Sequence, residues 1–310
     1  MAQKTPQKKL VKKKNAATGR AKAVKQGRTK KAGSILHHGG CMKRFQLLTL
    51  GTVIFGVCLS PLMGQWVAYP TAGVPRRPDG KANLAAACPR TADGRPDLSG
   101  IWITQPNRVA TPNFPGCEPT AEEFANIGAS LKEGLPYQPW ARELVKKRIA
   151  EQRLHDPLSY CLPVGPVRLH TWSTPRKVIQ APGLLLMLNE LNASYRQIFT
   201  DGRPSPVDPN PTWNGYSSGK WEGDTLVVHT KGFRDGLWLD STGNPMTDEA
   251  ALTERFRRLN FGRMDIEITV DDPKAYIKPW SVTLHQKIVI DTDLLDFTCT
   301  ENEKDTSHLR

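Results

Sequence analysis

The ten residues Ser281–Ile290 read SVTLHQKIVI, and apolar and polar side chains alternate along them. In an extended chain Leu284 and Ile288 would point to one side, and Thr283 and Lys287 to the other. Such period-two alternation is typical of an antiparallel strand with one face in a core and the other in water. The stretch therefore predicts a β-sheet protein.

Similar segments, separated by turn sequences, fill most of the chain after residue 176. Ala181-Pro182-Gly183 and Glu222-Gly223-Asp224 are two of the turn sequences. The expected strands cover residues 98–104, 177–180, 184–191, 195–200, 219–221, 225–230, 252–258, 265–270, 281–290 and 294–299. About nine or ten short strands with tight turns predict a mainly β fold, an antiparallel barrel or a curled sheet or sandwich.

A small helical insert is expected within this β domain, over residues 120–153. Thr120-Ala121-Glu122-Glu123 has the form of a capping box and predicts a helix to about Lys132. Pro139 suits the first position of a second helix, Trp140–Arg153. The domain organisation is thus a β domain over residues 93–310 with a two-helix insert. Residues 65–92, rich in Pro, Gly and Ala, are expected to be a linker.

The net charge of +13 is concentrated in a leader. Residues 1–64 hold 14 of the 43 Lys and Arg and none of the 30 Asp and Glu, so the remainder carries 29 basic and 30 acidic residues. Residues 1–41 form a basic leader with few large apolar side chains, which predicts disorder. Either they bind nucleic acid or acidic lipid through their charge, or translation starts later. The near-neutral remainder predicts no nucleic-acid partner for the mature domain.

A second possible start lies at Met42. Lys43 and Arg44 precede the apolar run Phe45–Leu59, and small residues follow near Gly64. This is the layout of a secretory signal peptide over residues 42–64, and the run is short for a membrane span. We expect a periplasmic or secreted protein. Alternatively, an uncleaved segment 45–63 anchors it in the inner membrane, with the basic arm on the cytoplasmic side, and this is the only membrane contact expected.

Cysteine usage agrees with export. Cys88, Cys117, Cys161 and Cys299 lie beyond the leader, an even number that suits two disulfides in an oxidising compartment. Four cysteines allow three pairings. We favour a Cys161–Cys299 bridge, which would tie the middle of the chain to its last expected strand.

One short motif resembles a catalytic site. Gly215-Tyr216-Ser217-Ser218-Gly219 has the G-x-S-x-G spacing of a hydrolase nucleophile elbow, and Glu222 and Asp224 follow it as a carboxylate pair. A nucleophile elbow requires a strand before the serine and a helix after it. Here a loop precedes it and a strand and hairpin turn follow, so the stretch is interpreted as architecture. No histidine spacing indicates a metal site, no glycine pattern indicates a nucleotide site, and no cofactor is expected.

Charged residues within the strands are the stronger functional signal. Arg196 lies between Tyr195 and Gln197, and Glu254 and Arg255 lie on one expected strand. Because alternate residues of a barrel strand point inward, one face of that strand could line a polar cavity or form a structural ion-pair network. The candidate ligand-binding residues are Tyr195, Arg196, Trp213, Trp238 and Arg255. The candidate acid–base residues are Glu190, Asp240 and Glu254.

Several longer motifs resemble a family of exported bacterial β-rich proteins without an assigned activity. They are TADGRPDLSGIW (91–102), YQPWARELVKKR (137–148), DPLSYCLPVGPVR (156–168), RQIFTDGR (196–203), GKWEGDTLVV (219–228), TERFRR (253–258) and TVDDPKAYIKPW (269–280). The resemblance covers most of the chain after residue 93 and implies export, but it supplies no catalytic residues. Gly100-Ile101-Trp102 is also similar to the G-x-W that opens lipocalin barrels, which implies a ligand-binding barrel.

Three functions follow as hypotheses. The first is an exported β-barrel that binds a small, partly apolar ligand, anionic or carboxylate-bearing to suit the arginines. The second is a periplasmic acid–base enzyme, a lyase, isomerase or hydrolase. The third is an envelope interaction protein without a cavity.

Overall fold

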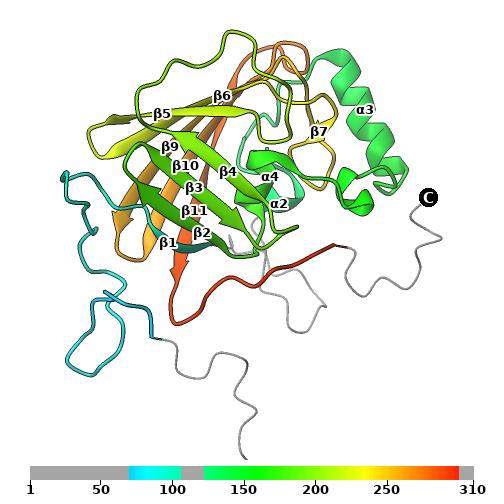
Figure 1. Cartoon of the computed structure of the whole chain (residues 1–310). Coiled ribbons are helices and arrows are strands. Elements are labelled where there is room, and N and C mark those ends of the chain that lie inside the picture. Colours follow the sequence, from blue (N-terminus) through cyan, green and yellow to red (C-terminus); the bar gives the residue numbers. More distant parts are fainter. Residues whose placement is uncertain (1–69, 106–121, 300–310) are drawn as a thin grey trace, which may run out of the picture. The chain divides into compact units, whose positions relative to one another are not determined.

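The computed structural model describes residues 70–105 and 122–299, and its main feature is a closed barrel of nine strands (Figure 1). The strands in barrel order are β1 (Gly100–Thr104), β11 (Trp280–Val289), β10 (Arg263–Asp271), β9 (Ala251–Asn260), β6 (Thr225–Lys231), β5 (Tyr216–Glu222), β4 (Tyr195–Phe199), β3 (Leu184–Asn189) and β2 (Arg176–Ala181). The predicted mainly β fold with a small helical insert is confirmed, and of the predicted alternatives the structure has the barrel.

Strand β1 closes the barrel. Trp102 pairs with Ile288 of β11 on one side and with Arg176 of β2 on the other. All neighbouring pairs in the barrel are antiparallel except β4 and β5, which run parallel and pair only through Ile198–Ser217 and Phe199–Ser218. A loop of more than a dozen residues joins β4 to β5 and makes the parallel arrangement possible.

Alternate residues of the long strands fill the barrel interior. On β11 the side chains of Val282, Leu284 and Ile288 are buried, as the alternation in the sequence predicts. Trp102 at the end of the G-x-W motif is fully buried, and Arg258 stacks over its ring at 4.9 Å. The barrel interior is therefore a packed core over much of its length.

The helices gather on the side of the barrel away from the β5–β6 hairpin (Figure 1). They are α2 (Glu122–Ala125), α3 (Pro139–Ala150), the 3₁₀ turn η1 (Pro157–Tyr160) and α4 (Gly165–Thr171). Helix α2 ends seven residues before the expected Lys132, because Asn126 Oδ1 accepts a hydrogen bond from Gly128 N and starts a turn. Among the described residues, no helix combines the length and apolar character that a membrane span requires.

Two segments outside the barrel strands differ from expectation. Residues 294–299 do not form a strand and make only an isolated bridge, between Phe297 and Leu191. Glu190 holds their backbone, since Phe297 N donates to Glu190 O at 3.3 Å and Leu295 N donates to Glu190 Oε1 at 3.0 Å. In the expected linker, Leu84 O accepts a hydrogen bond from Gly262 N at 2.8 Å, so that part of residues 65–92 lies against the barrel. A two-stranded sheet of β7 (Leu237–Trp238) and β8 (Pro245–Met246) completes the described structure.

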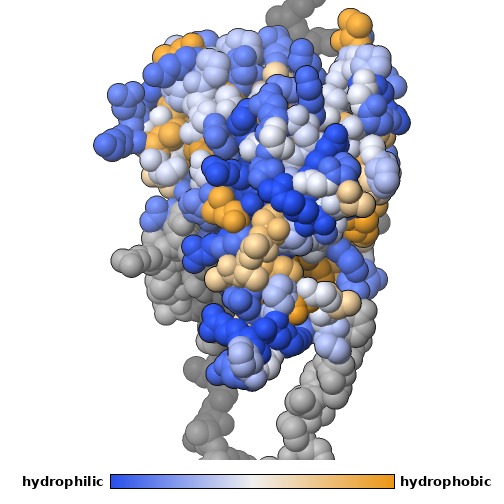
Figure 2. Space-filling view, turned by 90° about the vertical axis from the view of Figure 1, so that its left-hand side faces the viewer, coloured by the Kyte–Doolittle hydropathy of each residue, from blue (hydrophilic) through white to orange (hydrophobic). Residues whose placement is uncertain are grey.

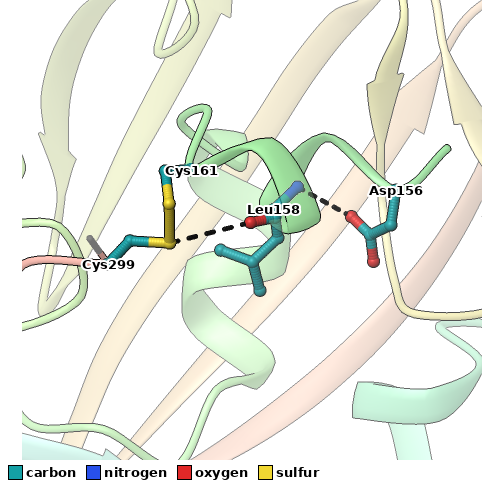
Figure 3. Close-up of a disulfide and its surroundings, with 4 residues drawn as sticks. All are labelled: Asp156, Leu158, Cys161 and Cys299. Atoms are coloured by element: carbon teal, nitrogen blue, oxygen red, sulfur yellow. Dashed lines mark hydrogen bonds between the residues drawn. A yellow bond between two sulfur atoms is a disulfide. The ribbon is translucent and has the colours of Figure 1, made fainter. Parts of the chain in front are cut away.

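The Cys161–Cys299 disulfide is present and confirms the favoured pairing (Figure 3). It joins the end of η1 to the C-terminal segment, across 138 residues of sequence. Asp156 caps η1 by accepting a hydrogen bond from Leu158 N at 2.9 Å, and it also forms a two-pronged ion pair with Arg168 of α4 at 2.7 and 2.6 Å. The disulfide thus anchors the chain end beside the turn that precedes α4.

Candidate ligand pocket and buried charge network

A pocket of about 480 Å³ lies where the β2–β3 and β5–β6 hairpins end; we call it the mouth pocket. Leu185 and Leu226, both buried core residues, lie at its base, and Trp221 of β5 forms one wall. Residues 91–95 and Thr200 complete the rim. Figure 2 shows this side of the molecule, with hydrophobic surface in its middle and hydrophilic residues around it.

The rim of the mouth pocket is fixed by contacts between distant segments. Arg90 forms two hydrogen bonds with Asp224 of the β5–β6 turn, at 2.9 and 2.7 Å. Arg95 lies over the Trp221 ring, 6.0 Å from its centroid, and its Nε is 3.2 Å from Asp93. Both ion pairs are exposed, so each contributes little stability. Of the two, Arg90–Asp224 joins the N-terminal segment to the barrel, whereas Asp93–Arg95 lies within that segment.

The barrel interior contains a charge network centred on Glu254 of β9. Arg196 Nη1 donates to Glu254 Oε1 at 2.9 Å, and Nη2 donates to Glu254 Oε2. His170, on the helix α4, places Nε2 2.8 Å from Glu254 Oε1. Arg196 Nε donates to Ser217 Oγ at 3.1 Å, and Nη2 also donates to Thr230 Oγ1 at 2.9 Å. All five side chains are buried, so these hydrogen bonds pair most of their polar atoms with one another away from water.

The protonation states in this network follow from burial and charge. Burial alone would raise the pKa of Glu254, but the Arg196 charge and the hydrogen bonds outweigh it and lower that pKa to about 2. Burial lowers the pKa of His170 to about 4, against the attraction of Glu254. At neutral pH the carboxylate is therefore ionised and the imidazole neutral. His170 Nε2–H then donates to Glu254, and Nδ1 has no hydrogen-bond partner among the described residues.

A second buried arginine holds helix α4 in the barrel. Arg176 Nη1 donates to Leu169 O at 2.5 Å, and its Nη2 donates to Gln286 Oε1. Thr104 Oγ1 donates to His170 O at 2.6 Å. Because side chains from three strands bind the last carbonyls of α4, the helix fills the barrel interior at this end.

The predicted residues divide between the interior, a second pocket and the surface. Arg196 and Glu254 face each other inside the barrel, which settles the inward face of β9. Arg255 points outward and pairs with Glu222 at 3.2 Å, so it does not join Arg196. Tyr195, Arg196 and Trp213 line another pocket, of about 510 Å³, where β4 and β5 diverge. The Arg196 charge there is already neutralised by Glu254.

The remaining candidates make structural contacts. Asp240 is fully buried and accepts hydrogen bonds from the backbone of Ile127 at 2.7 Å and Gly243 at 3.0 Å, although burial raises its pKa. Trp238 is buried beneath Arg148, whose guanidinium lies 4.4 Å from the ring centroid. Burial also raises the pKa of Glu190, which binds the C-terminal segment.

The serine motif forms no nucleophile elbow. Ser217 lies within strand β5, and its Oγ contacts Arg196 Nε at 3.1 Å and Thr230 Oγ1 at 3.0 Å. Neither contact is a base that could take the serine proton. The described residues also contain no cluster of three or more His, Cys, Asp or Glu arranged to hold a metal ion.

Sequence reasoning missed His170 and Arg176, which are buried in the barrel interior. The one local signal was Gly165-Pro166, since Gly165 has a φ of 77° and proline favours the first turn of a helix. That signal predicts a short helix, but not that the helix enters the barrel.

Comparison with known proteins finds no match: no protein-family model, no curated protein and no solved structure is similar to this chain.

Proposed function

We propose that this chain is an exported protein that binds a small, partly apolar molecule in the mouth pocket. The observation that supports this most is the pocket itself, about 480 Å³ in volume, with Leu185 and Leu226 at its base and Trp221 in its wall. Ligand sites in proteins have this size and combine an apolar lining with a few polar groups at the rim. The disulfide and the leader support export, because disulfides persist in oxidising compartments.

Arg95 is the group that would recognise an anionic or carboxylate head. It lies at the rim, and its ion pair with Asp93 uses the Nε, whereas a guanidinium has five N–H donors. The buried arginines Arg176 and Arg196 are poor candidates, because main-chain carbonyls and Glu254 already bind them. An apolar tail in the pocket and a carboxylate beside Arg95 would match the chemistry of the site.

The geometry favours binding over acid–base catalysis. Glu254 is enclosed by Arg196 and His170, and Asp240 is tied into a turn. A catalytic carboxylate needs reach to a substrate. Among the described residues that line the mouth pocket, the one carboxylate is that of Asp93, which Arg95 pairs.

The test is native mass spectrometry of protein purified from its source, followed by titration with anilinonaphthalene sulfonate, a small apolar anion that fluoresces in apolar sites. Thr200→Trp should fill the mouth and abolish both bound mass and fluorescence. Arg95→Gln should weaken binding of the probe about tenfold, which is the effect of losing one charge-assisted contact. Thr283→Trp, on the exposed face of β11, is the control and should bind normally. Equal binding by Thr200→Trp and the control would refute the mouth pocket as the site.

A further inference from the structure

The second pocket, of about 510 Å³, lies where β4 and β5 diverge; we call it the seam pocket. The two strands run parallel and pair through only two residues of each, so the chain before these residues separates. Asn214 Nδ2 donates to Tyr195 O at 3.0 Å and bridges the two sides. Among the described residues, the linings of the seam pocket and the mouth pocket share no member, so the seam pocket is a separate site.

Aromatic side chains are concentrated in the lining of the seam pocket. Four of the thirteen described residues that line it are aromatic, against 7% of the whole chain: Tyr195, Phe199, Trp213 and Tyr216. The rings of Phe199 and Tyr216 stack with their centroids 5.4 Å apart. The guanidinium of Arg234 lies 5.4 Å from the centroid of the Trp213 ring. Because neighbours already hold these three rings, a ligand that packs against them would lose little free energy in ordering them.

The outer face of β4 supplies groups that no neighbour uses. Tyr195 is 61% exposed, and within the described part of the chain its ring has no aromatic contact and its hydroxyl no hydrogen bond. Gln197 is exposed on the same face of β4, and its side-chain amide has no partner among the described residues. An amide and a hydroxyl can each donate and accept hydrogen bonds. This wall therefore presents a free aromatic ring beside two free polar groups.

The seam pocket offers no uncompensated charge to a ligand. Arg196 is the one charged residue among the described residues that line it, and its side chain is 3% exposed. Glu254 already binds the Arg196 guanidinium, with Nη1 and Oε1 2.9 Å apart. An ionic ligand would find no counter-charge here and would lose hydration without compensation. The lining therefore favours a neutral ligand.

We propose that the seam pocket binds a neutral sugar residue of an oligosaccharide. One face of a pyranose ring carries polarised C–H groups, which pack against the negative face of an aromatic ring. Its hydroxyl groups both donate and accept hydrogen bonds, as the free groups of Tyr195 and Gln197 do. A purely apolar ligand would leave these two polar groups unpaired. A proline-rich peptide lacks backbone N–H donors at its prolines, so it would use only the donors of the wall. This proposal does not depend on the function proposed for the mouth pocket.

The test is isothermal titration calorimetry of the full-length chain with three neutral oligosaccharides: maltotetraose, cellotetraose and tetra-N-acetylchitotetraose. We expect saturable binding of at least one of them, unchanged by added salt because no charges pair. Tyr195→Ala should weaken this binding about tenfold, the effect of losing one aromatic contact, and Gln197→Leu should weaken it by a similar factor through lost hydrogen bonds. Both side chains are exposed, so both variants should fold. Trp140→Ala, which removes an exposed aromatic side chain from α3, is the control and should bind normally.

Three results would overturn the proposal. They are no binding of any of the three oligosaccharides by the wild-type protein, equal affinity in Tyr195→Ala and Trp140→Ala, and tighter binding of a polyproline peptide than of every oligosaccharide. The last result would assign the seam pocket to proline-rich peptides and reject the sugar.

Discussion

Replacing Glu254 by glutamine should be among the most damaging conservative substitutions in the barrel. The carboxylate accepts two hydrogen bonds from Arg196 and one from His170, and its side chain is fully buried. Glu254→Gln keeps the shape of the side chain but removes its charge. It leaves the Arg196 guanidinium, whose side chain is 3% exposed, without a counter-ion.

Two arguments give the same size for the loss of free energy of unfolding in Glu254→Gln. Removing one partner of a buried ion pair costs about 3–5 kcal/mol. The pKa of Glu254 falls from 4.5 to about 2 in the folded state, which corresponds to about 3 kcal/mol of stabilisation of the charged form at neutral pH. We therefore expect the free energy of unfolding of Glu254→Gln to fall by about 3–4 kcal/mol.

The assay is urea unfolding at pH 7, monitored by tryptophan fluorescence, with two companion variants. Arg255→Gln on the outer face of the same strand breaks an exposed pair, so it should cost at most about 1 kcal/mol. The double variant Glu254→Gln with Arg196→Met should lose less free energy of unfolding than the sum of the two single variants. The reason is that Arg196→Met removes the buried charge that Glu254→Gln leaves unpaired. Ser217 and Thr230 would still bind each other at 3.0 Å. A loss below about 1 kcal/mol for Glu254→Gln, or strict additivity in the double variant, would refute the buried network.

Three further predictions concern acid, the disulfide and a glycine. The folded pKa values of His170 (about 4) and Glu254 (about 2) both lie below their unfolded values of 6.5 and 4.5, so both groups stabilise the fold at high pH. The free energy of unfolding should therefore fall as the pH drops from about 6.5 to 2. In Glu254→Gln the urea midpoint should no longer show the part of this fall that lies below pH 4.5. Opening the disulfide by Cys161→Ser with Cys299→Ser should lower the free energy of unfolding by about 2–4 kcal/mol; an unchanged urea midpoint would contradict it. Gly215→Ala should lower the thermal midpoint, since φ is 62° and the new Cβ would lie 2.7 Å from Lys231 O, at a cost of at least about 1–2 kcal/mol; Gly223→Ala, also at positive φ but with open space around it, is the control and should cost less.

Local pattern was sufficient for most of the strands and for the surface turns. The alternation in Ser281–Ile290 depends only on which residues are apolar, so it reports a half-buried strand whatever its neighbours are. The second helix of the insert was expected over Trp140–Arg153 because of Pro139, and the structure has it at Pro139–Ala150. The Cys161–Cys299 bridge was a preference among pairings that the sequence could not separate, and the structure contains it.

Other features depended on contacts between residues distant in sequence. Because side chains alternate along a strand, Glu254 and Arg255 must lie on opposite faces of β9. Only the closure of the barrel through β1, which pairs with β11 and β2, decides which of these faces is inside. His170 lies 84 residues from Glu254, and no local pattern reports a contact over that distance. The local turn after α2 is also held by a residue distant in sequence, since Ile127 N donates to Asp240 Oδ2 at 2.7 Å.

The sequence by itself determined the class of fold, the turns, the basic character of residues 1–64 and the strands that would carry buried charge. These properties arise from composition and from side-chain spacing along a few neighbouring residues. Only the tertiary structure decided that helix α4 fills one end of the barrel, that Arg196 and Glu254 neutralise each other, and that the mouth pocket forms beside residues 91–95. The physical reason is that burial and ion pairing depend on distances through space, which chain closure sets and which no stretch of sequence contains.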